Sequence, residues 1–336
     1  MAGRESRFYA LLYRSNVSGI RGLYNYGLSC CVNALLQSFS ATWELVRVLD
    51  RWEPPAREGD FLNVPLQLKR AVKAMQSDHS QPAPHQHLLR CLDKNHISLY
   101  KQHDADEVFL SMLNYMEKHM DDKALALEIH NLYRISVETY LECLDCAHIL
   151  SGSSYLLSLP LHIRAEQNSL EDRIKSFFEL QELNGRNKCR CAQCGSKTQC
   201  RQGLKLLSLP PVLPVHLKRF HNYHGYIRKL DCKVTFPETF DFRDILKEEA
   251  FSKNYVQKES KYMLYAVIVH LGTVMSGHYT AYVRHHGGWY YANDSRVNQA
   301  TWEDVQDTYG GLVSGTAYML LYRRTKDEAE EPKCSG

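Results

Sequence analysis

The first clear pattern along the chain is a set of apolar residues at helical spacing within residues 22–39, GLYNYGLSCCVNALLQSF. From Val32 to Phe39 the apolar positions follow i, i+3, i+4 and i+7, which is the stripe of an amphipathic helix. The glycines upstream disfavour a helix, and Ser29 is a residue type that caps helix N-termini. We therefore expect a helix that begins directly after Ser29.

The rest of the chain separates into a helical half and a strand-rich half. A charged, proline-containing loop is predicted at 51–60, and residues 63–135 are mostly helical in pattern, most clearly at 102–120. One further helix is expected at 169–183, where Ser169 and Asp172 resemble a capping box. Apolar runs bounded by glycine and proline predict strands at 134–146, 153–163, 203–210, 212–220, 264–272, 278–284, 289–294 and 317–324. Helices first and an antiparallel sheet afterwards indicate an α+β fold.

Both ends of the chain are expected to lie outside the folded domain. Residues 1–19 are predicted to be a loose arm and residues 326–336 a polar, disordered tail. This leaves one domain at 20–325. The first residues contain neither a long apolar core nor a small-residue cleavage site, so we expect no signal peptide.

Composition narrows the class of protein and its surroundings. The 336 residues are 44% hydrophobic and 24% charged, which is ordinary for a globular protein, and no run of 18 apolar residues predicts a membrane span. A net charge of +3 gives no electrostatic reason to expect nucleic acid or an anionic membrane as a partner. Eleven cysteines without a secretory signal are expected to be reduced thiols, metal ligands or a nucleophile. We therefore expect a cytosolic or nuclear protein.

Two adjacent cysteines, Cys30 and Cys31, would lie in the first turn of the first expected helix. There, unpaired N–H groups and the helix dipole favour an anion such as a thiolate. At about 100° per residue, Cys30 points away from the apolar stripe and Cys31 lies nearer its edge. We therefore expect Cys30 to be the exposed thiol and Cys31 to be packed. Taken alone, the pair is more simply explained as two buried, inert cysteines.

A nucleophilic cysteine needs a histidine base, and one of the sixteen histidines stands at a predicted hairpin. Residues 276–297, SGHYTAYVRHHGGWYYANDSRV, form two strand patterns joined at His-His-Gly-Gly. With the hairpin centred on that turn, His278 pairs with residue 295, and Asn293 lies one diagonal step away, about 7–8 Å between Cα atoms. A one-residue slip would bring Asp294 there instead. Either side chain can orient an imidazole, and the order Cys, His, Asn is that of papain-like enzymes.

Two C-x2-C pairs, CLDC and CAQC, indicate a zinc site in a chain whose cysteines are reduced, and the second pair is followed by glycine. The four expected ligands are Cys143, Cys146, Cys191 and Cys194. A four-cysteine site has no open position, so the zinc would be structural. Cys189 and Cys200 are competing candidates, and free thiols or redox chemistry are the alternative to metal binding.

The stretch QHDADE at 102–107 places Asp104, Asp106 and Glu107 at a helix start. Acidic residues are ordinary partners of the helix dipole at that place. The functional alternative is a carboxylate clamp for a basic peptide.

These stretches together resemble the ubiquitin-specific proteases. Residues 22–39 resemble the cysteine box of that family, and QHDADEVF resembles the helix motif that follows it. Residues 203–220 resemble the stretch before the histidine box, 276–297 the histidine box itself, and 317–324 the closing strand. The resemblance implies that 20–325 is a catalytic domain with a papain-like α+β fold of helical thumb, antiparallel-sheet palm and short zinc-bearing fingers.

Carried over by position, the resemblance implies Cys30 as the nucleophile, His278 as its base and Asn293 as the third member, with Asp294 beside it. Asn25 matches the family's oxyanion-hole asparagine. The residues that the resemblance implies for holding a modifier's C-terminal tail are Gln102, Asp104, Glu107, Phe220 and Tyr279. Such a tail ends in Gly-Gly, so the channel to the thiolate must be narrow.

Ser29, Cys31 and Ala292 depart from the family pattern, which usually has threonine, an aromatic residue and a bulky residue there, and none of these changes removes a catalytic group. The doubled cysteine, VPLQL, QHDA and VQDTYGG most resemble the interferon-induced branch of the family, which removes an interferon-stimulated modifier of two ubiquitin-like domains. That resemblance implies a thiol isopeptidase acting on modifier conjugates, and a negative regulator of interferon signalling that contacts receptor components.

We expect a monomer that binds no nucleic acid and does not insert into membranes. The alternatives are a general deubiquitinase, or a scaffold that binds a modifier or receptor and for which catalysis is secondary.

Overall fold

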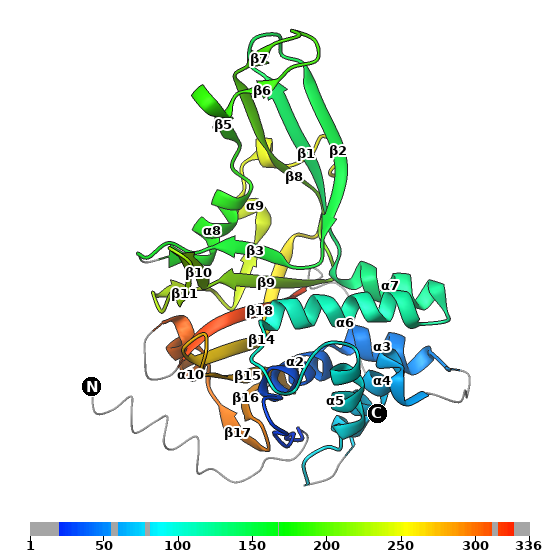
Figure 1. Ribbon diagram of the computed structural model, residues 1–336. Helices are drawn as coiled ribbons and strands as arrows, with labels where there is room; N and C mark the ends of the chain where they lie inside the picture. Colours follow the sequence, from blue (N-terminus) through cyan, green and yellow to red (C-terminus); the bar gives the residue numbers. More distant parts are fainter. Residues whose placement is uncertain (1–19, 55–59, 78–80, 167, 311–314, 326–336) are drawn as a thin grey trace.

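The computed structural model describes residues 20–54, 60–77, 81–166, 168–310 and 315–325, so the expected arm and tail lie outside the described residues. Figure 1 shows a group of helices, a central sheet on which they pack, and a narrow sheet that projects from it. These parts correspond to the expected thumb, palm and fingers, and the α+β class is confirmed.

The thumb is built from six helices of the described chain and one 3-10 turn. They are α2 (Cys30–Ala41), α3 (Trp43–Arg51), η1 (Asp60–Leu62), α4 (Val64–Met75), α5 (Gln86–Lys94), α6 (Ala105–His119) and α7 (Lys123–Tyr133). Side-chain caps fix several starts: Asn63 caps α4, Asp104 caps α6 and Asp122 caps α7. By contrast, α2 is buried from Cys30 to Phe39, so packing rather than capping holds it in place.

The palm is a sheet in which strands distant in sequence lie side by side. Its order is β17-β16-β15-β14-β18-β9-β3, with β13 paired to β14, and only the β3–β9 pair is parallel. Its strands are β3 (Leu159–His162), β9 (Val212–Lys218), β13 (Thr239–Asp241), β14 (Lys261–Gly272), β15 (Gly277–His285), β16 (Gly288–Asn293), β17 (Arg296–Ala300) and β18 (Thr316–Arg324).

Each face of the palm sheet supports its own apolar core. Ala266 and Ile268 of β14 pack with the thumb helices on one face. Val267 and Val269 of the same strand pack into the second core on the other face. Neighbouring residues therefore alternate between the two cores, as the side-chain period of a strand requires. Because α2 contacts β14, β15 and β16 directly, the start of α2 is held beside the strands that carry His278 and Asn293.

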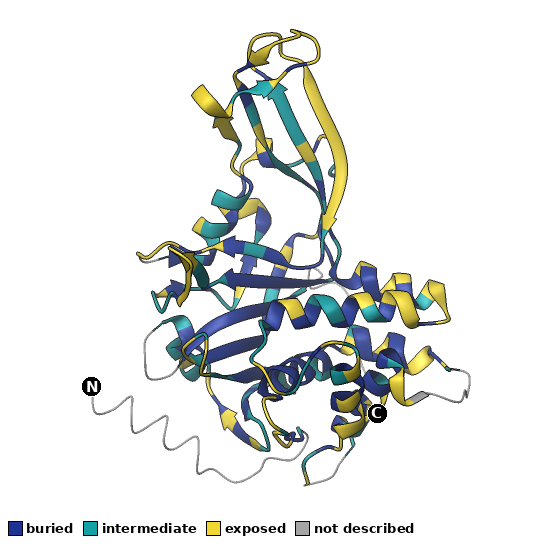
Figure 2. Ribbon diagram, viewed as in Figure 1, coloured by how far each residue is buried: buried dark blue, intermediate teal, exposed yellow. Residues whose placement is uncertain are grey.

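The fingers are a four-stranded antiparallel sheet with far less buried surface. Its order is β2-β1-β8-β5, and a short β6–β7 ladder lies at the tip. These strands are β1 (Ile135–Cys143), β2 (Ile149–Leu156), β5 (Gln181–Leu183), β6 (Cys189–Arg190), β7 (Lys197–Thr198) and β8 (Cys200–Ser208). Figure 2 shows β2 exposed along nearly its whole length, whereas β9 and β18 of the palm are buried.

Short elements complete the described chain. They are the parallel pair β4 (Asn168–Ser169) and β12 (Val234–Thr235), the hairpin β10 (Phe220–Tyr223) and β11 (Tyr226–Lys229), the helices α8 (Leu170–Phe177), α9 (Phe242–Ile245) and α10 (Trp302–Gln306), and the turns η2 (Gly185–Asn187), η3 (Glu248–Ala250) and η4 (Asp307–Tyr309).

The helix expected at 169–183 is shorter in the structure. The Ser169 side chain accepts a hydrogen bond from the Asp172 N–H at 3.0 Å, as the capping pattern predicted, but α8 ends at Phe177. The prediction was wrong for residues 181–183, which form β5 and pair with β8 at the edge of the finger sheet. A strand pairing with a distant segment therefore overrides the local helical pattern.

Candidate active site

Cys30 and Cys31 are the first two residues of α2, as the sequence predicted, but both are buried. Cys30 is 4% exposed and Cys31 is 2% exposed, so the expectation of an exposed Cys30 was wrong. The reason is that Cys30 belongs to the apolar core between the thumb helices and the palm sheet, where its sulfur interacts with His278. Burial raises the pKa of the Cys31 thiol well above its usual value, and the nearby Cys30 and Asp104 add to this effect. The two neighbours therefore differ in their partners and not in exposure.

Ser29 stands at the N-cap position of α2, but its hydroxyl does not cap the helix. The Ser29 Oγ instead accepts a hydrogen bond from the Tyr26 N–H at 2.9 Å and lies 3.2 Å from Asn25 Oδ1, to which it donates. The expected cap is therefore replaced by a bond that shapes the preceding loop. As a result, the first-turn N–H groups of α2 keep the anion-binding character of an uncapped helix start.

His278 and Asn293 are brought together by the hairpin that the sequence predicted. Strands β15 and β16 pair Ala281 with Ala292 and continue to the turn, so the register is the expected one. The Nε2 of His278 lies 2.8 Å from Asn293 Oδ1, which leaves Nδ1 as the ring nitrogen for Cys30. The hydrogen bond with Cys30 is the main cause that raises the pKa of His278 to about 9. The Asn293 bond adds to this rise, and partial burial opposes it.

Asp294, the alternative partner for His278, has a different set of contacts. Its Oδ2 is 3.8 Å from His278 Nε2, too long for a hydrogen bond. The same Oδ2 accepts a hydrogen bond from the Asn25 amide at 2.9 Å, and Oδ1 accepts one from the Asn33 amide at 2.7 Å. Asp294 also has a positive φ of 50°, a conformation that aspartate tolerates better than most residues. Asn293 and Asp294, the two candidate partners of His278, are thus both in the site, with separate contacts.

The Asn25 side chain is held at both ends of its amide. Its Oδ1 accepts hydrogen bonds from the Ser29 N–H and hydroxyl, each at 3.2 Å, and one N–H is donated to Asp294. The second N–H remains available to a ligand. The loop can approach Asp294 this closely because residue 22 is glycine: a Cβ there would lie 2.3 Å from the backbone oxygen of Ser295.

Asn33 is a member of this network that the sequence pattern did not reveal. It follows Val32 on α2 and is 3% exposed. Its amide donates to Asp294, which lies 261 positions away in the chain. The only signal in the sequence was a polar residue inside an otherwise apolar helix, and that signal does not name the partner.

The five residues predicted to hold a modifier tail line one groove of about 410 Å³. The groove lies between the start of α6 and the β10–β11 hairpin, with β14 and β15 below it. Its predicted members are Gln102, Asp104, Glu107, Phe220 and Tyr279, and they are joined by His103, Asn222, Ile227, His270 and Val274. The sequence therefore identified half of the lining residues.

The two acids of the groove differ in how far their oxygens are already used. Asp104 Oδ1 accepts the Asp106 N–H at 2.8 Å, and Oδ2 accepts the Tyr318 hydroxyl. The Glu107 side chain is exposed, and within the described residues its carboxylate has no hydrogen-bond or ion-pair partner. Glu107 is thus the acid that is free to bind a cation in the groove.

Gln102 connects this groove to the catalytic hairpin. Its Nε2 donates to the Gly277 carbonyl at 2.8 Å, directly before His278. Gly277 itself is required by close packing, because a Cβ there would lie 2.2 Å from His270 Nε2. The groove therefore leads along β15 toward the Cys30–His278 pair.

The four predicted metal ligands meet at the tip of the fingers. The sulfurs of Cys143, Cys146, Cys191 and Cys194 all lie within 4.8 Å of one another. Each C-x2-C turn ends in a residue with positive φ, Ala147 at 56° and Gly195 at 69°, so the two turns have matching shapes. In the described chain, the competing candidates Cys189 and Cys200 are not part of this cluster.

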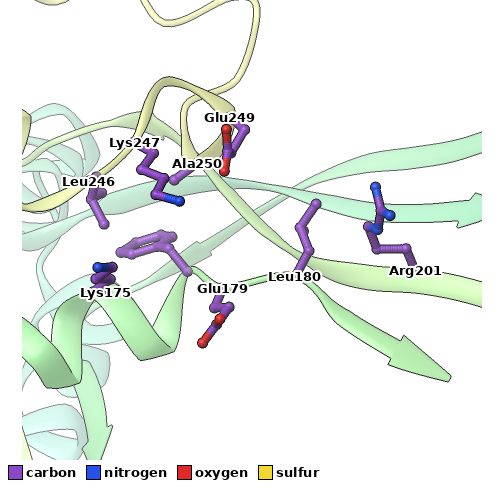
Figure 3. Close-up of a pocket in the computed structure, with 9 residues that line it drawn as sticks. Lys175, Glu179, Leu180, Arg201, Leu246, Lys247, Glu249 and Ala250 are labelled. Atoms are coloured by element: carbon purple, nitrogen blue, oxygen red, sulfur yellow. The ribbon is translucent and has the colours of Figure 1, made fainter.

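A hollow of about 520 Å³ lies at the base of the fingers, away from Cys30. Figure 3 shows Lys175, Leu180, Arg201 and Lys247 around it, contributed by α8, the segment between α8 and β5, β8, and the segment before η3. Its lining is charged and apolar and includes none of the predicted catalytic or tail-binding residues. It is therefore separate from the candidate active site.

A papain-like fold with a cysteine, a histidine and an asparagine in one hydrogen-bonded row defines a thiol protease. A family model described as "Ubiquitin carboxyl-terminal hydrolase" matches residues 21–322, and the chain belongs to this family. The expected family is thereby confirmed, and with it the activity class of a cysteine protease.

Several curated proteins are similar to the chain. It is 36% identical over 318 residues to "Ubl carboxyl-terminal hydrolase 18" of Homo sapiens, a match that spans 91% of the chain and 85% of that protein. The protein of the same name from Mus musculus is also 36% identical, over 91% of the chain and 86% of its own length. "Ubiquitin carboxyl-terminal hydrolase 47" of Xenopus tropicalis is 28% identical over 94% of the chain, but only 28% of that protein is matched.

Among the described residues, none of the helices is both long enough and apolar enough to cross a membrane.

Proposed function

We propose that this protein is a thiol-dependent isopeptidase that removes a ubiquitin-like modifier from conjugated proteins after the modifier's C-terminal Gly-Gly. The observation that carries the proposal is the row of Cys30, His278 and Asn293 at the end of a groove lined by the five tail-binding candidates. Family membership supports the same reaction class.

In the proposed reaction, the Cys30 thiolate attacks the carbonyl carbon of the modifier's last glycine. The oxyanion that forms accepts hydrogen bonds from the free N–H of Asn25 and from the uncapped start of α2. The His278 imidazolium, whose pKa is raised to about 9, gives its proton to the departing lysine amine. Water then attacks the thioester and His278 accepts one of its protons, so that the C–S bond breaks and Cys30 returns as a thiolate. The modifier leaves as a carboxylic acid, which loses the second proton to solvent and becomes a carboxylate.

Asn293 holds His278 in the orientation that this proton transfer needs. Its carbonyl oxygen accepts a hydrogen bond from the Nε2–H of His278 at 2.8 Å, which fixes the tautomer and directs Nδ1 toward the Cys30 sulfur. Asp294 holds Asn25 and adds negative charge 3.8 Å from the ring, which favours the imidazolium. The two neighbouring residues thus have different tasks.

The groove explains why a Gly-Gly tail is the expected substrate end. Bulky side chains, Phe220 and Tyr279, stand on its walls, and a pair of glycines passes where larger residues would be blocked. Further out, the unpaired Glu107 carboxylate is placed to bind an arginine of the tail.

The finger cysteines are proposed to hold one structural zinc ion. A tetrahedron with Zn–S bonds of about 2.3 Å places sulfurs about 3.8 Å apart. The Cys143–Cys194 and Cys146–Cys191 sulfurs are 3.9 Å and 3.7 Å apart, so the cluster has the required size. Zinc there would fix the finger tip and would supply no chemistry to the active site.

We propose that the modifier is the interferon-stimulated protein of two ubiquitin-like domains. We further propose that this protein is a negative regulator of interferon signalling in the cytoplasm and nucleus. In this role it would act as a monomer and have receptor-signalling components as partners. The support is the sequence resemblance to the interferon-induced branch together with 36% identity to proteins named Ubl carboxyl-terminal hydrolase 18. Proteins named for ubiquitin, such as hydrolase 47, are less similar at 28%.

Fluorogenic substrates made from each modifier test this proposal. We expect a kcat/KM for the interferon-stimulated modifier at least about 100-fold above that for ubiquitin, which corresponds to about 2.7 kcal/mol of discrimination. Equal rates would identify a general deubiquitinase. If the protein binds a modifier tightly at neutral pH and with reductant but turns over none, the proposed isopeptidase activity is contradicted and a scaffold function is favoured.

A further inference from the structure

His85 lies at the N-terminus of α5, behind the candidate active site and outside its groove. It is 3% exposed, and its Nε2 lies 2.8 Å from Oδ1 of Asn33 on α2. A buried histidine with so short a polar contact next to the network around Asp294 calls for an explanation, because burying a polar ring without a partner is costly.

The direction of this hydrogen bond follows from the other contacts of Asn33. The Asn33 amide nitrogen donates to Asp294 Oδ1 at 2.7 Å and to the Tyr24 carbonyl at 3.3 Å, so Oδ1 faces His85 and can only accept. His85 therefore carries a proton on Nε2, and in the neutral ring the longer contact of 3.3 Å between Nδ1 and the Ala83 carbonyl oxygen is not a hydrogen bond. Burial lowers the pKa of His85, although the Ala83 carbonyl and Asp294 oppose this, so the ring donates as neutral imidazole.

The same line of hydrogen bonds continues to Asn25. His85 donates to Asn33, Asn33 donates to Asp294 Oδ1, and Asp294 Oδ2 accepts from Asn25 at 2.9 Å. Each carboxylate oxygen of Asp294 thus holds one amide, and the torsion of the carboxylate is fixed from the His85 side. The remaining N–H of Asn25 is the group that faces the reacting carbonyl in the proposed reaction.

Removing the His85 side chain would remove the hydrogen bond that holds the Asn33 amide oxygen. The Asn33 amide would be free to rotate, and Asp294 would lose the anchor on Oδ1. The carboxylate then has a nearby alternative partner, because His278 Nε2 is only 3.8 Å from Oδ2. A turn toward His278 would take the carboxylate away from Asn25.

We propose that His85 is a positioning residue that orients the oxyanion-binding amide of Asn25 through Asn33 and Asp294. It touches neither the substrate nor the Cys30 sulfur, and its role rests on the proposed isopeptidase function.

The first test compares three variants under saturating and limiting substrate. His85→Leu removes the donor and keeps an apolar side chain, and we expect kcat to fall about tenfold or more, with KM changed less than about twofold. Loss of an oxyanion donor itself costs about 10²–10³ in kcat, which sets the upper bound. His85→Gln places an amide N–H near the position of Nε2 and should restore most of the activity.

The matched control is His130→Leu. His130 is also a buried histidine, on α7, and its ring nitrogens make no hydrogen bond within the described part of the chain. The His130→Leu substitution should leave kcat unchanged. A folded His85→Leu protein with wild-type kcat would overturn the proposal.

A double variant separates positioning from general loss of structure. The Asn25→Ala protein lacks the amide that His85 is proposed to orient, so adding His85→Leu should lower kcat no further. An additional tenfold loss would show that His85 acts elsewhere and would overturn the assignment.

The wild-type protein allows a test that needs no variant. In protein labelled with ¹⁵N-histidine, the His85 ring should show the neutral tautomer with its proton on Nε2 at about pH 8, which lies above the ordinary pKa of imidazole. The opposite tautomer would contradict the proposal even if His85→Leu failed to fold. Absence of any wild-type turnover and of labelling by a modifier with a C-terminal electrophile would remove the proposed function itself, a different failure.

Discussion

The catalytic centre and the finger tip are held together by different means. At the catalytic centre, Cys30 begins a helix that is buried as far as Phe39, and a hydrogen bond joins this helix to Asp294, 261 positions further along the chain. At the finger tip, β6 and β7 are two residues long, β2 is exposed, and the four cysteine sulfurs are the shared contact. Packing and side-chain hydrogen bonds fix angles to within the tolerance of a reaction, whereas a metal can hold a tip that has too little apolar surface to fold by itself.

The largest effect should come from the Cys30 sulfur. Cys30→Ser should lower kcat/KM by about 10⁴-fold or more, because a serine hydroxyl is a far weaker nucleophile than a cysteine sulfur. The free energy of unfolding at neutral pH should change far less, since packing around residue 30 is retained. Substrate turnover and urea unfolding measured on the same preparation check this, and retained turnover would move the nucleophile elsewhere.

Removal of zinc should affect the other region. Protein purified without chelator should contain one zinc per chain, and strong chelation should open the fingers, since structural zinc in small domains contributes about 10 kcal/mol or more. Limited proteolysis should then cut between residues 143 and 200 first, while small alkylating reagents still react with the catalytic thiol. Elemental analysis that finds no zinc, or simultaneous unfolding of the fingers and the catalytic centre, would show that the two regions are not stabilised by different means.

Glu107 should affect substrate binding more than folding stability. Charge-assisted contacts contribute about 1.5–3 kcal/mol, so Glu107→Ala should raise the KM of a modifier substrate by roughly 10- to 150-fold. The loss in folding stability should stay below about 1 kcal/mol, the size of a helix-dipole effect. Glu117→Ala, at the exposed C-terminal end of α6, is the matched control. An unchanged kcat/KM for Glu107→Ala would reduce the residue to a dipole partner.

The pH dependence should follow His278. The folded pKa of about 9 lies above the unfolded value of 6.5, so His278 stabilises the fold below pH 6.5 and this contribution is lost as pH rises through 9. Activity should likewise fall on the alkaline side near pH 9, as the imidazolium is lost. Asn293→Ala removes one cause of the raised pKa, so the alkaline limb of kcat/KM should move to lower pH. In Cys30→Ser the main cause is gone, and unfolding free energies at pH 6 and pH 9.5 should differ less than in wild type.

The smallest effect is expected for the neighbouring thiol. Cys31→Ala should keep most of the activity and cost about 1–2 kcal/mol of stability, as for a small truncation in a core. Its fully packed position and raised pKa make Cys31 a thiol and not a thiolate at neutral pH. Thermal unfolding and turnover of the variant measure both quantities.

The parts predicted correctly from the sequence are those in which local spacing decides the geometry. The turn between β15 and β16 sets the register that joins His278 to Asn293, and the two C-x2-C turns set the metal cluster. The start of α2 at Cys30 follows from its apolar stripe.

The predictions that failed depended on distant parts of the chain. The end of α8 is decided by pairing of residues 181–183 with β8, and the burial of Cys30 by its place in the core between the thumb helices and the palm sheet. Asn33 and His85 were not found, because a polar residue in an apolar helix does not indicate which side chain it will meet. Local patterns carry no information about such contacts until the fold is known.

The most direct test of the central claim is to react the wild-type protein with a modifier that carries a C-terminal electrophile, and to map the bond by peptide mass spectrometry. Cys30 and Cys31 are equally buried at one helix start, but only Cys30 has the histidine partner. We predict a single adduct on Cys30, unchanged in Cys31→Ala and absent in Cys30→Ser. An adduct on Cys31 would mean that the direction of the first turn of α2 has been misassigned, and the account of the active site would have to be rebuilt around the other thiol.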